Sequence, residues 1–220
     1  MVFAGQQPLL FCALNRSAAR AISQYSLESF DLTRENLMTS LMERVAGERR
    51  RLRQVRQSLT AATDKKSGGD ATWGPFYLAI TEYFEASMER LHEQDIRMGK
   101  MLRDKIDMED PDNLEALEEL DRRLTGLQAH HEKLLAARDA LQAGEADGLD
   151  RFEEVGGAYA SYMMNNMGHH AGTANLAGDH FSQEDWEHMT MVSEAAQQRE
   201  QELHAKVFAL LPAGLELPSE

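Results

Sequence analysis

Residues 41–59, LMERVAGERRRLRQVRQSL, place apolar side chains at intervals of three and four residues. The apolar positions are Leu41, Val45, Leu52, Val55 and Leu59. This spacing predicts a helix with one apolar face, of the kind that packs into a helical bundle. At mid-height the same face passes through either Glu48 or Arg49, so a charged side chain is expected to point inward.

The same periodicity continues through most of the chain, and no stretch alternates as a strand would. Helices are expected from about Pro75 and from about Pro111, because proline favours the first turn of a helix. A fourth helix is expected to fade near Gly178, and a fifth to run from about Gln183 to Leu210. We therefore predict an all-α fold, an antiparallel up-down four-helix bundle with an additional C-terminal helix.

Ser182 is expected to cap this last helix, with Asp185 completing a capping box. Three regions follow from the pattern: an N-terminal extension over 1–32, a helical bundle over 33–182, and a C-terminal helix and tail over 183–220. The extension carries Arg16 and Arg20 but no acid before Glu28. We interpret it as a loosely ordered segment, with an organelle transit peptide as the alternative and a secretory signal excluded by its short apolar run.

The composition restricts the function. The 220 residues carry a formal charge of −14, which disfavours binding to nucleic acids or anionic membranes. No run of about 18 apolar residues appears, so no transmembrane helix is expected. Cys12 is the single cysteine, which indicates a reducing compartment, and we predict a cytoplasmic protein.

Polar residues interrupt the apolar faces of four predicted helices. Glu48 or Arg49 lies on the first face. Gln94 or Asp95 lies on the second face, and His92 lies next to that face. On the third face lies His131, and on the fourth Tyr162, Asn165 and His169 form one stripe. Converging histidines and carboxylates inside a bundle are how such folds bind metal ions.

Each of these residues also has a structural interpretation. His131 can be a hydrogen-bonded core histidine, and Asp95 can form a buried ion pair with Arg49. Methionines 163, 164 and 167 suit core packing, and glycines 168, 172 and 178 suit close helix contact. The arginines between residues 44 and 56 suit a solvated surface.

The stretch YASYMMNNMGHHAGTANLAGDHFSQEDW, residues 159–186, resembles the last core helix of bacterial hemerythrin-like (HHE cation-binding) proteins. LQAHHEKL is similar to the family's Leu-x-x-Glu-His-x-x-Leu, with His131 at the ligand position. VAGERRRL has the same spacing as this motif, with Arg49 at the position of the ligand histidine. RLHEQDIRM resembles the second-helix His-x-x-x-Glu segment, with the histidine falling at Arg90 or Leu91 and the glutamate at Gln94.

The resemblance implies a four-helix bundle with a non-haem di-iron site that handles oxygen or responds to nitric oxide, redox state or iron. Of the family's ligands, His131 alone is unchanged. The other candidate metal ligands in this chain are Glu48, His92, Asp95, His169 and His170. Two hypotheses follow from these departures. Arg49, with Asp95 or Glu48, replaces the metal charge; or His131, His169 and one acid form a mononuclear site.

Two functions remain open at this stage. The first is a sensor or binding protein for metal, oxygen, nitric oxide or redox state, with mononuclear or di-iron non-haem iron. The alternative is a metal-free regulatory or interaction protein that binds an unidentified protein partner or a second copy of itself. We predict no enzymatic activity and no catalytic residues, because the chain has no nucleophile elbow and only one Glu-x-x-His motif, Glu89 to His92.

Overall fold

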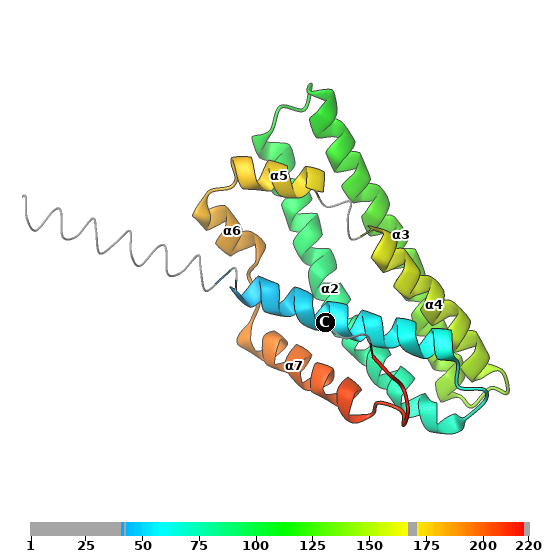
Figure 1. The fold of residues 1–220 in the computed structure, drawn as a ribbon. Helices are drawn as coiled ribbons and strands as arrows, with labels where there is room; N and C mark the ends of the chain where they lie inside the picture. The colour runs from blue at the N-terminus through cyan, green and yellow to red at the C-terminus, as the bar shows by residue number, and fades with distance from the viewer. Residues whose placement is uncertain (1–40, 42, 167–170, 218–220) are drawn as a thin grey trace, which may run out of the picture. The chain divides into compact units, whose positions relative to one another are not determined.

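The computed structural model describes residues 41, 43–166 and 171–217. The chain divides into two compact units, Met1–Ala46 and Gly47–Glu220. In the first unit the described residues, 41 and 43–46, are helical. In the second unit every regular element of the described residues is a helix (Figure 1). The predicted all-α fold class is therefore confirmed for the part of the chain that the structure describes.

The helices follow one another through short connections. Within the second unit, the first helix covers residues 47–65. It is followed by η1 (Ala71–Trp73), α2 (Gly74–Lys105), α3 (Pro111–Gln142), α4 (Gly148–Asn166), α5 (Ala171–His180), α6 (Gln183–Met189) and α7 (Glu194–Ala209). In Figure 1, α3 and α4 lie side by side, and α7 lies along α2. No helix of the described residues is both long enough and apolar enough to cross a membrane.

Prolines lie at the starts of the two long helices, as predicted, and an aspartate caps α3. Pro75 lies in the first turn of α2 and Pro111 in that of α3. The Asp110 carboxylate accepts a hydrogen bond from the Asp112 backbone N–H at 2.9 Å, which caps α3. Such caps satisfy backbone donors that have no partner within the helix.

The single C-terminal helix predicted from Gln183 to Leu210 is wrong, because the structure has two helices there. The capping box of Ser182 and Asp185 begins the first of them, α6, as predicted. This helix ends at Thr190, whose hydroxyl donates to the Trp186 carbonyl at 2.7 Å. Ser193 then caps α7 by accepting from the Ala196 backbone N–H. Hydroxyl side chains that bond to nearby backbone favour such helix ends over helix interiors.

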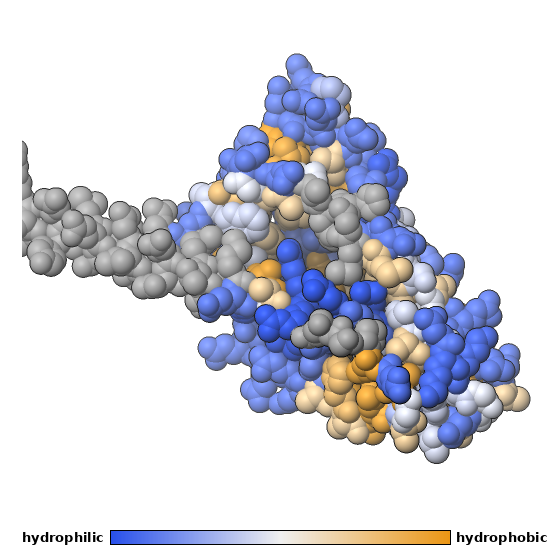
Figure 2. All heavy atoms as spheres, in the orientation of Figure 1, coloured by the Kyte–Doolittle hydropathy of each residue, from blue (hydrophilic) through white to orange (hydrophobic). Residues whose placement is uncertain are grey.

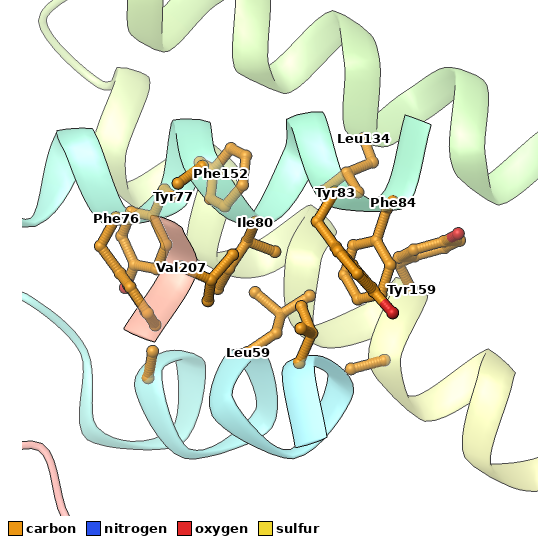
Figure 3. Packing of buried hydrophobic residues seen from close by; sticks show 14 of the residues in the cluster. Leu59, Phe76, Tyr77, Ile80, Tyr83, Phe84, Leu134, Phe152, Tyr159 and Val207 are labelled. Atoms are coloured by element: carbon orange, nitrogen blue, oxygen red, sulfur yellow. The ribbon is translucent and has the colours of Figure 1, made fainter. Parts of the chain in front are cut away.

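The main apolar core lies between the first helix, α2, α3, α4 and α7 (Figure 3). Aromatic rings dominate it: Tyr77 and Phe152 have centroids 4.8 Å apart, and Phe84 and Tyr159 5.3 Å apart. A second cluster joins α2 and α3 to α5 and α6 around Leu102. Deleting one fully buried ring from such a core costs about 3–5 kcal/mol.

Gly156 and Gly172 are among the glycines that allow close helix contact. A Cβ at Gly156 of α4 would lie 3.1 Å from Leu59 Cδ1 of the first helix. A Cβ at Gly172 of α5 would lie 3.1 Å from the Ala116 Cβ of α3. Gly178 has open space at the Cβ position. Of the glycines singled out in 162–186, Gly172 therefore serves packing, while Gly168 lies outside the described residues.

Candidate functional site

Arg90 of α2 joins two buried glutamates from different helices. Its Nη1 lies 3.0 Å from Glu48 Oε2 of the first helix, and its Nη2 lies 2.6 Å from Glu200 Oε2 of α7. The side chains of Arg90, Glu48 and Glu200 are 10%, 5% and 4% exposed. The guanidinium therefore provides the charge that allows two carboxylates to be buried at this level of the fold.

Further polar groups surround Glu200. Its Oε1 lies 3.6 Å from Arg51 Nε and accepts a hydrogen bond of 3.4 Å from the Tyr83 hydroxyl. Burial raises the pKa of Tyr83, and the charge of Glu200 raises it further. Tyr83 therefore stays protonated and donates to the carboxylate. We call Glu48, Arg51, Tyr83, Arg90 and Glu200 the Arg90 network.

The Arg90 network is close to charge balance. Two arginines and two glutamates give no net charge, which is the condition under which ionised groups can be buried. Two atoms of the network, Glu48 Oε1 and Arg51 Nε, are buried and have no hydrogen-bond partner among the described residues. His204 of α7 lies beside the network, with Nε2 3.0 Å from Gln54 Oε1 and its ring against Tyr83.

A second ion pair lies between α2 and α3. Arg123 Nη2 bonds Asp95 Oδ2 at 2.9 Å, and the two side chains are 4% and 26% exposed. Burial raises the pKa of Asp95, while the charges of Arg123, Arg49 and His92 oppose that rise. Burial lowers the pKa of Arg123, and Asp95 opposes this. The carboxylate and guanidinium each stabilise the charged form of the other.

His131 of α3 faces the core next to Tyr159 of α4, with ring centroids 5.8 Å apart. His131 Nδ1 and the Tyr159 hydroxyl are both buried, and neither has a hydrogen-bond partner among the described residues. Burial lowers the pKa of His131, with a smaller opposing effect from Glu85. In Figure 3 the Tyr159 ring extends past Phe84 toward the edge of the apolar cluster. Two buried polar atoms of neighbouring residues thus have no hydrogen-bond partner among the described residues.

The structure separates the predicted ligands. Glu48 is bound in the Arg90 network, Asp95 is bound by Arg123, and His92 is half-buried. His131 is beside Tyr159, and His169 and His170 lie outside the described residues. Among residues 41, 43–166 and 171–217, no three histidine, cysteine or acidic side chains are arranged to hold a metal ion.

The sequence predicted that either Glu48 or Arg49 points inward, and of these two Arg49 is exposed. Glu48 is the buried alternative. Each residue turns the helix by about 100°, so only one of two neighbours can lie at the centre of a buried face. Glu48 continues the face of Leu52, Val55 and Leu59, and Arg49 falls on its flank. The inward cations come instead from α2 and α3.

Sequence reasoning missed five residues of the two ionic sites: Arg51, Tyr83, Arg90, Arg123 and Glu200. Glu200 shares a face with Leu203 and Val207 at intervals of three and four residues, and all three are buried. Arg123 lies beside Leu120 and Leu124 on the buried face of α3. A check for charged residues on the apolar faces of the third and last helices would have identified both.

Gln94 is also buried, as the alternative to Asp95 on the face of α2. The predicted stripe on the fourth helix consists of Tyr162, Asn165 and His169. The structure describes the first two, and His169 lies outside the described residues. The Tyr162 hydroxyl donates to the Arg123 carbonyl at 3.5 Å, and its ring stacks on His130 with centroids 4.5 Å apart. Asn165 is exposed, so of these two only Tyr162 contacts the polar interior.

Comparisons with known proteins do not extend this description. No protein-family model matches the chain, and neither a curated protein nor a solved structure matches it significantly.

Proposed function

We propose that this chain is a metal-free helical-bundle protein that acts by binding a partner, as a cytoplasmic regulatory or interaction protein. One observation carries the proposal. Each interior acid that the sequence offers as a metal ligand already bonds a guanidinium from another helix, Glu48 through Arg90 and Asp95 through Arg123. Carboxylates engaged in this way have their charge balanced without a cation.

The proposed frame is an up-down bundle of the first helix, α2, α3 and α4 with α6 and α7 appended, of the hemerythrin-like kind. Support comes from the contacts between consecutive helices α2, α3 and α4, and from the packing of Leu59 against Gly156 that brings the first helix onto α4. Within this frame, the role of charge replacement that the resemblance suggested for Arg49 falls to Arg90 and Arg123. Both are permanently protonated side chains and cannot act as metal ligands.

The test is metal content together with its effect on stability. The protein would be produced in iron-supplemented medium, purified without chelator or histidine tag, and analysed by mass spectrometry and ultraviolet–visible absorption with and without oxygen. We expect far less than one metal per chain, no oxo-bridge bands, and the same unfolding temperature with and without a chelator. Stoichiometric iron whose removal lowers the unfolding temperature would contradict the proposal.

A second candidate function is a hemerythrin-like sensor for metal, oxygen, nitric oxide or redox state. The unused Nδ1 of His131 favours it, because a neutral imidazole nitrogen without a hydrogen-bond partner is free to bind a metal ion. The sequence suggests His169 and one acid as further ligands of a mononuclear site. Metal lost in His131→Ala and kept in the control His188→Ala, an exposed histidine of α6, would support this candidate.

A further inference from the structure

Three arginines form a stripe along one flank of the first helix. Arg49, Arg53 and Arg56 follow one another at intervals of four and three residues, so their side chains share one side of the helix. Arg49 and Arg53 are exposed and Arg56 is half-buried. The core-facing side of the helix carries Val55 and Leu59 instead. Figure 2 shows strongly hydrophilic surface over the middle of this helix. We call these three residues the arginine stripe.

The arginine stripe has no bound counter-charge among the described residues. Seven other arginines lie within ion-pair distance of a carboxylate: Arg51, Arg90, Arg103, Arg122, Arg123, Arg138 and Arg151. Arg50, Arg97 and Arg199 show no such pair among the described residues either, but they do not lie on the stripe. The acid that influences Arg49 is Asp95, whose carboxylate Arg123 already bonds at 2.9 Å. In a chain of net charge −14, three arginines on one side of a helix that no carboxylate of the described residues bonds form a local concentration of positive charge.

Arg56 offers a hydrogen-bond donor to such a ligand. Its Nε is buried and has no hydrogen-bond acceptor among the described residues. Burial lowers the pKa of Arg56, and the charge of Arg53 lowers it further. A desolvated guanidinium with no acceptor costs free energy. An anion at the stripe would supply the missing acceptor and offset the repulsion between Arg53 and Arg56.

We propose that the arginine stripe binds a small polyanion that carries two or more linked phosphate groups. The three Cα positions span about 10 Å along the helix, and long arginine side chains can converge over that length on a diphosphate or triphosphate. The planar guanidinium donates two parallel hydrogen bonds to phosphate oxygens, which makes arginine well suited to this ligand. Three fixed positive charges also match the charge of such a group.

The acidic remainder of the chain favours a small ligand over a nucleic acid. Surface charges act over about 8 Å at physiological ionic strength. A diphosphate stays within that distance of the stripe, whereas a long polyanion would extend over acidic surface and be repelled. The inference goes beyond the proposed function, because the stripe lies on the flank of the helix and not among the interior ion pairs.

Isothermal titration calorimetry on the full chain would test the proposal, with inorganic pyrophosphate and tripolyphosphate as probes. Citrate would serve as the carboxylate comparison, and a short single-stranded DNA as the nucleic-acid comparison. We expect saturable binding of both phosphate probes that weakens with added salt, and weaker binding of citrate and DNA. The triple variant R49Q/R53Q/R56Q should lose about tenfold or more in affinity, since charge-assisted hydrogen bonds are removed.

Arg50→Gln is the matched control, because Arg50 is an exposed arginine of the same helix that lies about a quarter turn off the stripe. It should bind the phosphate probes as the wild type does. Urea unfolding of each variant establishes that it is folded. The proposal is wrong if neither phosphate probe binds, if Arg50→Gln loses as much affinity as the triple variant, or if DNA binds more tightly.

Metal content measured on the same sample separates this inference from the proposed function. If the purified protein contains stoichiometric metal, the metal-free proposal is wrong. If phosphate still binds after a chelator has removed that metal, the arginine stripe remains the binding site. Binding that disappears on chelation would mean that the probe binds through a metal ion, which would overturn the stripe. Binding by metal-free protein would agree with both.

Discussion

Arg90 Nη2 lies 2.6 Å from Glu200 Oε2, and this contact joins α2 to α7 across 110 residues of sequence. Because Arg90 also bonds Glu48, one guanidinium holds three helices together. A cation in this position has two effects. It allows the two acids to be buried, and it fixes where the first helix and α7 dock on α2.

Arg90→Met should destabilise the protein strongly, because it leaves Glu48 and Glu200 buried with reduced compensation. Removing one partner from a buried ion pair costs about 3–5 kcal/mol, and urea unfolding would measure it. The control is Arg97→Met on the same helix, at a half-buried arginine for which the described residues show no ion pair. Equal stability of the two variants would show that the Arg90 network does not stabilise the fold.

Tyr159→Phe and Tyr77→Phe should change stability in opposite directions. The Tyr159 hydroxyl is buried and has no hydrogen-bond partner in the described part of the chain, so its removal should stabilise the metal-free protein by about 1 kcal/mol. The Tyr77 hydroxyl donates to Glu153 Oε1 at 2.9 Å, so its removal should destabilise by about 1 kcal/mol. Thermal and urea unfolding would compare the two. Destabilisation by Tyr159→Phe would indicate an unseen ligand or water at that hydroxyl.

Two glycine-to-alanine substitutions should also change the stability of the protein in opposite directions. Gly178 has open space at the Cβ position within α5, so Gly178→Ala should stabilise by about 0.5–1 kcal/mol through helix propensity. At Gly126 of α3 a Cβ would collide with the Tyr162 hydroxyl. Gly126→Ala should therefore destabilise by about 1 kcal/mol or more through overpacking. Equal effects in unfolding experiments would contradict the packing of α4 on α3.

Stability should fall when the pH is lowered below neutrality. Burial lowers the pKa of His131 and of His204, where Arg51 adds to the effect. Each histidine therefore binds a proton more readily in the unfolded chain, whose pKa is about 6.5. The free energy of unfolding that each neutral histidine contributes is fully present above pH 6.5. It is lost as the pH falls from 6.5 toward the lower pKa of the histidine in the folded protein.

The double variant H131Q/H204Q should show a smaller loss of stability between about pH 7 and pH 5 than the wild type. Urea midpoints collected across this range would measure the difference. His188→Gln, at an exposed position of α6, is the control and should keep the wild-type slope. If the urea midpoint of the double variant falls with pH as steeply as that of the wild type, other groups cause the acid sensitivity.

Much of the fold could be predicted from local sequence, but the partners of the interior charges could not. The starts of α2 and α3 follow from Pro75 and Pro111, and the start of α6 from its capping box, because these signals act within a few residues. The break between α6 and α7 was missed. Thr190 and Ser193 end and restart the helix there without a glycine or proline to mark the position.

The interior ion pairs join residues that are far apart in the chain. Glu48 was one of two candidates for an inward position, and a difference of one residue decides whether a charge is buried or exposed. Its partner Arg90 and the second acid Glu200 lie 42 and 152 positions away. Helical periodicity shows that a position is buried but does not show which distant side chain it meets.

The position of Glu200 on α7 has a consequence for synthesis. A nascent chain that has not yet reached α7 contains the first helix and Arg90 but only one of the two buried carboxylates that Arg90 bonds. The apolar core is also incomplete at that stage, since Leu203 and Val207 belong to it. The fold can therefore be completed only after the C-terminal helix has been translated. A chain truncated before α7 would expose part of its apolar core and leave the charge of Arg90 incompletely balanced, and chaperones and proteases would recognise it.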